Sequence, residues 1–225
     1  MDARRTQRPG AARRADRDDA EPGGLVARGR ELVFGPESAA SPLALGGRGV
    51  LLVGLALWSL AFFSSAMDGE RLAGSFMHLI HLPFHEGGHI LFMPFGSFLM
   101  SLGGSLTQLL VPLVCAGALL TRRDRFGAAV ALWWTGQSLM DIAPYVADAR
   151  ALRLMLLGGH TGAEVEGHDW EAILGALGWL SHDVALGRIA NALGVLLMLA
   201  ALAWGAHVLW KQHQARASGD TQPQW

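Results

Sequence analysis

Four stretches of about twenty residues with almost no charge constrain this chain more than any other feature. Residues 49–67, 102–120 and 189–210 contain no charged side chain, and residues 126–147 contain only Asp141. A helix needs roughly 20 apolar residues to cross about 30 Å of hydrocarbon. Only helices and closed barrels span lipid, and the alternation typical of barrel strands is missing. The sequence therefore predicts an all-α, polytopic helical membrane protein with four to six membrane segments.

Charge is concentrated outside these stretches. Residues 1–42 contain eight arginines and seven acidic residues, whereas the remaining 183 residues contain ten basic and twelve acidic side chains. Few large apolar residues accompany the charges of the first segment, which predicts a disordered polar tail over 1–42. A membrane domain is expected over 43–210, with a long polar loop at 148–183 that contains a short helix near 170–180. A polar tail is expected over 211–225.

The net charge and the cysteine content exclude several classes of function. The formal net charge is −1, which argues against nucleic acid as the main partner. Cys115 is the only cysteine, so an internal disulfide framework, a CxxC zinc ribbon and a CxxC redox pair are excluded. The expected partner is the lipid bilayer, and the expected location is integral to a bacterial plasma membrane.

The basic segments leave the orientation of the chain in the membrane open. The positive-inside rule places residues 121–125, which hold three arginines, and the tail after Lys211 in the cytoplasm. Residues 72–100 form a fifth apolar segment, which contains four histidines and two prolines. If this segment crosses the membrane once, the N-terminus lies outside. The arginines of the N-terminal segment favour the opposite arrangement, in which residues 72–100 are partly re-entrant.

One segment combines apolar residues with metal-binding side chains. His85, Glu86 and His89 form an HExxH motif within FMHLIHLPFHEGGHILFM, residues 76–93. On a helix the two histidines lie one turn apart on the same face, so both imidazoles can bind one Zn²⁺ while the glutamate acts as general base on a metal-bound water. The metal brings the pKa of that water near 7, and a peptide carbonyl is the natural target.

The surroundings of the motif add weight to this interpretation and leave others open. A carboxylate in a membrane helix costs about 2.5–3.5 kcal/mol on insertion scales, so it is seldom without a function. His78 and His81 share the helix face of the motif, either as donors that support the ligands or as the lining of a hydrated cavity. The alternative is a polar face that hydrogen-bonds neighbouring helices. Gly87 and Gly88 are expected to let another backbone approach, from a substrate or a packed helix.

A catalytic zinc site normally has three protein ligands, so a third ligand is expected elsewhere in the chain. Gln137, Asp141 and Asp148 lie on one polar stripe of an otherwise apolar helix, and Asp141 is the only charge inside it. Asp141 is therefore the predicted third ligand, and an ion pair with an arginine such as Arg150 is the alternative. His168 in the long loop competes for the same role. Gln137, Asp148 and His168 are otherwise candidates for supporting the metal or positioning the substrate.

An HExxH motif inside an apolar segment, followed by an apolar helix with a buried aspartate, resembles the site-2 protease family of intramembrane zinc metalloproteases. The resemblance covers about residues 72–150. It implies that His85, His89 and Asp141 bind zinc and that Glu86 activates water. The family cuts transmembrane helices of membrane-anchored proteins within the bilayer. This chain lacks the glycine that usually follows the aspartate and the PDZ domain of some members, so it resembles a divergent, compact member.

The predicted function is an intramembrane zinc metalloendopeptidase whose partner is a membrane-anchored protein substrate. The alternative is a non-catalytic membrane protein of protease-like fold that binds a metal, a haem group or a helix. A membrane di-iron oxygenase or desaturase needs several histidine boxes, whereas only four of the nine histidines here are clustered.

Overall fold

The computed structural model of the chain describes residues 22–65 and 67–220, and the regular elements there are helices. The chain divides after Gly35 into two units. The first contains helix α1 (Pro22–Phe34), and the second contains every other helix named below. The predicted all-α class is confirmed.

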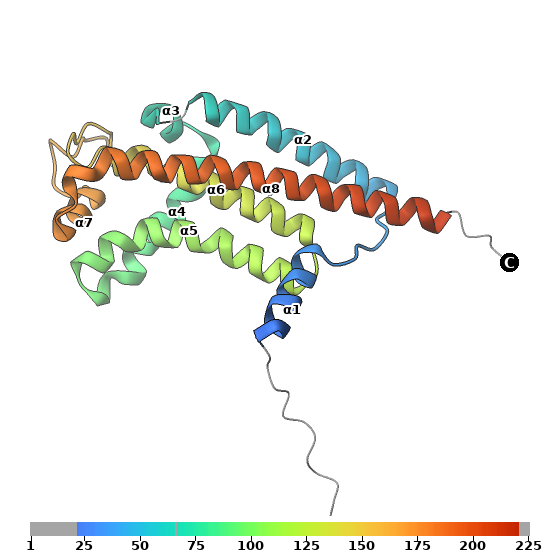
Figure 1. The fold of residues 1–225 in the computed structure, drawn as a ribbon. Coiled ribbons are helices and arrows are strands. Elements are labelled where there is room, and N and C mark those ends of the chain that lie inside the picture. The colour runs from blue at the N-terminus through green and yellow to red at the C-terminus, as the bar shows by residue number, and fades with distance from the viewer. Residues whose placement is uncertain (1–21, 66, 221–225) are drawn as a thin grey trace, which may run out of the picture. The chain divides into compact units, whose positions relative to one another are not determined.

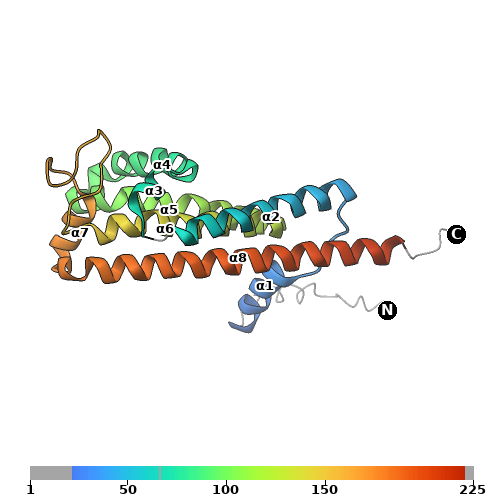
Figure 2. The same ribbon diagram turned by 90° about the horizontal axis from the view of Figure 1, so that it is seen from above.

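Three segments of the described chain are long and apolar enough to cross a membrane. They are α2 (Pro42–Ser64), α5 (Ser97–Thr121) and Leu180–Gly219, most of which is α8 (Asp183–Asp220). Figures 1 and 2 both show α2 running beside α8, and the two helices are in contact. All three expose large apolar side chains, such as Leu57, Val114 and Leu196, as helices that face lipid do. They correspond to three of the four uncharged stretches.

Helix α6 (Arg125–Ala147) covers the fourth uncharged stretch, but other helices enclose much of its surface. It packs along α8, where a Cβ on Gly136 would lie 2.8 Å from the carbonyl oxygen of Gly194. Such close approach through small residues is common between membrane helices. Trp133 donates a 2.8 Å hydrogen bond to Ser59, which links α6 to α2 as well. Polar residues of α6, such as Thr135, Ser138 and Asp141, are therefore buried against protein.

The histidine-rich segment does not form one long helix. It divides into two helices and a 3-10 turn: α3 (Gly69–Ala73), α4 (Phe76–Phe92) and η1 (Met93–Phe95). Ser75 begins α4, because its side chain accepts a 3.1 Å hydrogen bond from the backbone N–H of His78. With 17 residues, α4 is about 26 Å long, which is shorter than the hydrocarbon core of a bilayer.

Two glycines set how closely α4 and α5 approach. A Cβ on Gly88 would overlap the carbonyl oxygen of Gly103, so the two backbones touch at this crossing. The sequence predicted that another backbone could approach Gly88, and in the structure this backbone is that of α5. Gly87 has no atom within 4 Å of its Cβ position and borders open space instead.

A loop and a short helix connect α6 to α8. The loop covers residues 148–168, and two elements follow it: α7 (Asp169–Leu177) and η2 (Leu180–His182). His168 begins α7, since its Nδ1 accepts a 3.2 Å hydrogen bond from the backbone N–H of Glu171. Trp170 donates a 3.1 Å hydrogen bond to Ser105, which anchors α7 to α5. The short helix that the sequence predicted near 170–180 corresponds in position to α7.

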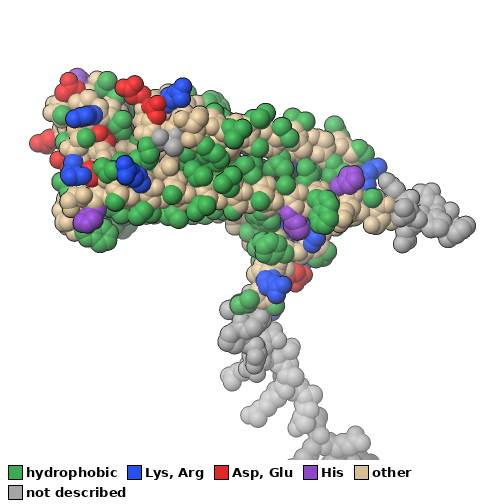
Figure 3. Space-filling view, turned by 45° about the horizontal axis from the view of Figure 1, so that its top comes forward, with side chains coloured by type: hydrophobic (Ala, Val, Ile, Leu, Met, Phe, Trp, Pro, Cys, Tyr) green, Lys and Arg blue, Asp and Glu red, His purple; other side chains and the backbone are tan. Residues whose placement is uncertain are grey.

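Charged side chains collect at opposite ends of the second unit. At one end, called the basic end, Arg48 contacts Gln212 at 2.7 Å and Asp124 at 3.9 Å, so the first part of α2 meets the start of α6 and the late part of α8. The opposite end, called the acidic end, contains α3, the 148–168 loop, α7 and the start of α8, where Arg150 pairs with Asp183 at 2.7 Å. Figure 3 shows apolar side chains between the ends and acidic side chains gathered at the acidic end.

Both predicted tails are partly helical. Helix α1 lies inside the segment expected to be disordered, because apolar residues such as Leu32 recur within it, and the prediction is wrong for residues 22–34. Helix α8 continues beyond Lys211 to Asp220, since the lysine, glutamine, alanine and arginine side chains there favour helix. Residues 1–21 and 221–225 lie outside the described residues.

Candidate metal centre

The acidic end contains a cavity of about 1240 Å³ between α4, α5, α6, α7 and the 148–168 loop. Apolar side chains of the loop form part of its wall, and polar side chains of the helices form the rest. The lining includes His85, Glu86 and His89 of the HExxH motif and extends to His78 and Asp141. The fold thus brings most of the predicted site residues into one space.

Hydrogen bonds determine which nitrogen of each motif histidine is available. Nδ1 of His85 lies 3.0 Å from Gln108 Oε1, and Nδ1 of His89 lies 2.8 Å from the backbone carbonyl oxygen of Met100. An amide or peptide oxygen can only accept, so both Nδ1 atoms carry the hydrogen and donate it. The two Nε2 atoms then keep their lone pairs, which is the form in which histidine binds a metal.

The carboxylate beside these two nitrogens belongs to Asp169, the first residue of α7. Its Oδ2 lies 3.4 Å from His85 Nε2 and 3.3 Å from His89 Nε2. Ligands of a tetrahedral zinc ion lie about 2.0–2.1 Å from the metal and therefore roughly 3.3–3.4 Å from each other. All three ligand atoms lie within 4.8 Å of one another. The two distances to the carboxylate oxygen fit one ion of this size.

The chemistry of the three atoms calls for a cation between them. Two imidazole lone pairs and a carboxylate oxygen are all acceptors, which repel one another at this distance unless a proton or a metal ion lies between them. Burial raises the pKa of Asp169, but where a proton rather than a metal ion lies between the groups, hydrogen bonds from His85 and His89 outweigh burial and bring that pKa down to about 2. The carboxylate is therefore ionised at neutral pH, as a metal ligand must be.

Tyr145 of α6 holds the carboxylate in this position. Its hydroxyl donates to Asp169 Oδ2 at 3.2 Å and accepts from the backbone N–H of Asp169 at 3.0 Å. The tyrosine ring also lies against the rings of His85 and His168, with centroids 6.3 and 4.3 Å away. One side chain thus orients the start of α7 relative to the motif.

A glycine of α5 leaves the space in which an ion would fit. A Cβ on Gly104 would lie 2.6 Å from His89 Nε2 and 2.7 Å from His85 Nε2. Any other amino acid would place a carbon atom in overlap with both imidazole rings. The residues present could therefore hold a metal ion, with His85, His89 and Asp169 as three protein ligands, the number typical of catalytic zinc sites.

The structure corrects the predicted place of Asp141. Its carboxylate lies 3.1 Å from Nδ1 of both His78 and His81, and it accepts a 3.0 Å hydrogen bond from Gln108 Nε2. It does not join the motif histidines, because it lies opposite the first half of α4 whereas the motif occupies the second half. The alternative ion pair with Arg150 does not form either, since that arginine pairs with Asp183.

His168 and Asp148 contact each other and not the motif. Because Nδ1 of His168 accepts from Glu171, its Nε2 carries the hydrogen and faces Asp148 Oδ2 at 3.5 Å. Burial lowers the pKa of His168 despite the nearby carboxylates, so the ring is neutral and offers no lone pair to the cavity. Asp148 accepts two backbone N–H groups of the loop at 3.1 and 2.8 Å. The role of both is to hold the loop and the start of α7.

The remaining predicted residues differ in their access to the site. Glu86 lines the cavity, and among the described residues its carboxylate has no hydrogen-bond or ion-pair partner. It is free to act on a bound molecule. Gln137 is fully buried in α6, and neither atom of its amide has a hydrogen-bond partner within the described part of the chain. It does not line the cavity, so the structure gives it no role at the site.

Sequence reasoning gave no role at the site to Asp169 or Gly104. It placed Tyr145 on the polar stripe without a role and explained Gln108 by a hydrogen bond between helices. Asp169 follows His168 in the polar loop, where solvation explains an acidic residue without any ligand. Its place at the start of an apolar short helix, beside a tryptophan, is the one signal that it folds inward. Gln108 is a single amide in an uncharged stretch, which indicates a buried hydrogen-bond partner. Comparison of the chain with protein families, curated proteins and solved structures finds no match.

Proposed function

We propose that this protein is a membrane-embedded, zinc-dependent peptidase that hydrolyses peptide bonds of membrane-anchored proteins. The observation that carries this proposal is the convergence of His85 Nε2, His89 Nε2 and Asp169 Oδ2 within 4.8 Å of one another, a set of atoms that could hold one metal ion. The reaction is that of the site-2 protease family, which the HExxH motif resembles. The third ligand differs, because Asp169 takes the place that the resemblance assigns to Asp141.

The residues around the ion have separate tasks. A zinc ion held here would polarise a peptide carbonyl and lower the pKa of water. Glu86 follows His85 directly and lines the same cavity, so it accepts the proton of the attacking water and delivers it to the leaving amine. Tyr145 keeps Asp169 in place through its hydroxyl.

We infer that four helices, α2, α5, α6 and α8, cross the bilayer and that α4 is re-entrant. Near its start α4 contacts Asp141 through His78, and near its end it contacts Asp169 through His89. Asp141 and Asp169 both line the cavity at the acidic end, so the start and the end of α4 lie in the same half of the second unit. An even number of crossings then brings the start of α2 and the end of α8 to the same side, the basic end.

The positive-inside rule assigns the two ends to the two sides of the membrane. The basic end carries six basic side chains: Arg48, Arg122, Arg123, Arg125, Lys211 and Arg216. The acidic end carries four: Arg71, Arg150, Arg153 and Arg188. The side richer in arginine and lysine is cytoplasmic. The cavity therefore opens on the non-cytoplasmic side, where it receives substrate segments that leave the membrane.

Cysteine labelling tests this orientation. In a Cys115→Ser background, His160→Cys places a thiol in the exposed loop of the acidic end, and Gln214→Cys places one on the exposed part of α8 at the basic end. A membrane-impermeant maleimide added to intact cells should label the first variant and not the second. Labelling of the second alone would reverse the assignment.

Exchange of Glu86 for Gln tests the proposed reaction. The purified protein should contain one zinc per chain, measured by atomic emission, and Glu86→Gln should keep the zinc while cleavage of a membrane-anchored reporter stops. Cleavage by this variant at the wild-type rate would contradict the assigned role of the glutamate. Zinc binding by a wild type that cleaves nothing would support the non-catalytic metal-binding alternative.

A further inference from the structure

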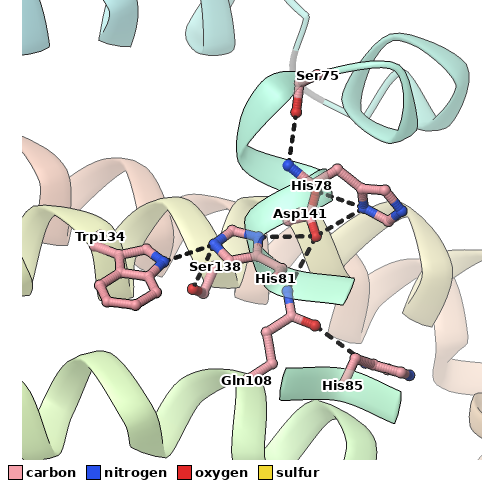
Figure 4. A network of polar contacts seen from close by, with 8 residues as sticks. All are labelled: Ser75, His78, His81, His85, Gln108, Trp134, Ser138 and Asp141. Atoms are coloured by element: carbon pink, nitrogen blue, oxygen red, sulfur yellow. Dashed lines mark hydrogen bonds and ion pairs between the residues drawn. The ribbon is translucent and has the colours of Figure 1, made fainter. Parts of the chain in front are cut away.

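A second polar cluster lies directly beside the proposed ligands. Figure 4 shows His78, His81 and Gln108 directed at the carboxylate of Asp141. The side chain of Asp141 is 3% exposed and that of His81 is 1% exposed. A buried carboxylate is costly unless donors surround it, and here three N–H groups do so at 3.0 to 3.1 Å. One hydrogen bond of the cluster, between Gln108 and His85, leads to a proposed metal ligand.

Two side chains of α6 fix the direction of the hydrogen bonds at His81. Trp134 Nε1 lies 2.9 Å from His81 Nε2, and Ser138 Oγ lies 3.1 Å from the same nitrogen. The indole N–H can only donate, so His81 Nε2 must accept. The imidazole then carries its hydrogen on Nδ1 and donates it to Asp141 at 3.1 Å. Asp141 is consequently held as an acceptor.

The state of Asp141 determines how the amide of Gln108 is turned. Its NH₂ group must face the accepting carboxylate, 3.0 Å away, and its oxygen must point the other way. That oxygen is the atom that accepts from His85 Nδ1 at 3.0 Å. Because Nδ1 donates to Gln108, the lone pair of His85 lies on Nε2, the atom that faces Asp169. One direction of donation therefore runs from His85 through Gln108 to Asp141.

We propose that Asp141 is a positioning residue that acts through Gln108 to hold the His85 ring with Nε2 toward the ion. The inference rests on the metal site proposed above. Groups that orient a ligating histidine typically change metal affinity by 10- to 100-fold when they are removed. A carboxylate reached through an amide fits that role, and it explains why the only charge of α6's apolar stretch is buried without touching the metal.

Zinc titration of the purified protein tests this inference without any substrate. Asp141→Asn replaces an accepting oxygen by a donor, so the amide of Gln108 loses its fixed direction and zinc affinity should fall by about 10- to 100-fold. The matched control is Ser138→Ala, which removes a bond to His81 Nε2 that Trp134 still satisfies. Its zinc affinity should stay within about twofold of wild type.

A paired substitution separates positioning from a merely structural role. Gln108→Glu places a second carboxylate beside Asp141 and should weaken zinc binding. Adding Asp141→Asn to Gln108→Glu restores a pair of one carboxylate and one amide, now with the carboxylate at position 108 and the amide at position 141. His85 Nδ1 and the amide at position 141 can then both donate to the carboxylate at position 108. Zinc affinity of the double variant should exceed that of Gln108→Glu alone, although each single change weakens binding.

The outcomes distinguish this inference from the proposed function. Wild-type zinc affinity in Asp141→Asn, or a double variant that binds no better than Gln108→Glu, overturns the positioning role. Loss of all zinc in Asp141→Asn, together with retention in Asp169→Asn, would make Asp141 a direct ligand and also overturns it. A wild type that binds no zinc refutes the proposed function itself.

Discussion

Alanine in place of Gly104 gives the most direct test of the metal centre. The new Cβ would lie 2.6 Å from His89 Nε2 and 2.7 Å from His85 Nε2. Nonbonded heavy atoms normally stay about 3.5 Å apart. The methyl group therefore overlaps both imidazoles by roughly 0.8–0.9 Å, at the nitrogen atoms proposed to bind the ion.

Relief of this overlap must displace a ligand. Rotation of either imidazole strains its bond from Nδ1 to Gln108 or to the carbonyl of Met100, and withdrawal of α5 opens the tight contact between Gly88 and Gly103. A zinc site tolerates ligand displacements of only about 0.2 Å. A shift of roughly four times that size should weaken zinc binding by about 100-fold or more, equivalent to about 2.8 kcal/mol.

The assay is competition for zinc against a chelator of known affinity, with the protein in detergent. Gly117→Ala is the matched control, because it makes the same substitution in the same helix at a position with no atom within 4 Å. The control should bind zinc like wild type. Full zinc affinity in Gly104→Ala, with an intact helical spectrum, would show that the ion does not lie between these imidazoles and would refute the assigned geometry.

Four further results are expected. Asp169→Asn should lose zinc, whereas Asp148→Asn should retain it, as metal analysis of the purified variants can show. Tyr145→Phe should lower zinc affinity by about tenfold, since the hydroxyl that holds the ligand is gone; the chelator assay measures it. Gly88→Ala should destabilise the protein by about 1–3 kcal/mol through overpacking, whereas Gly87→Ala, in open space, should not; thermal unfolding compares them. Zinc should be released as the pH falls, because protons compete with the metal for its ligand atoms, and the pKa of Asp169 near 2 means that the carboxylate is not the first ligand to be protonated; release that begins only near pH 3 would contradict this order.

The long helices were predictable because lipid imposes a simple rule on sequence. Any segment that spans hydrocarbon must be apolar over about 20 residues, so the stretches at 49–67, 102–120 and 189–210 could be read directly. The HExxH motif was equally visible, because both imidazoles come from one helix and helical spacing alone places them together. These predictions depend only on local geometry.

The third ligand depended on tertiary structure. Asp141 was the better candidate by composition, since a lone charge in an apolar helix must have a partner. Sequence spacing cannot reveal that the partners are His78 and His81 or that α7 folds back over the second half of α4. The contact that brings Asp169 inward is a tyrosine hydroxyl 24 residues earlier in the chain. Only the packing of α6 against the loop establishes it.

The length of α8 has a practical consequence. Its 38 residues make a rod of about 57 Å, nearly twice the hydrocarbon thickness of a bilayer. The pairing of Asp183 with Arg150 holds the first turn of α8 at the acidic end, so under the proposed orientation the surplus turns extend past the opposite side of the bilayer. A fluorescent protein fused behind Asp220 is therefore expected to lie at the far end of a long helix, away from both the bilayer and the cavity.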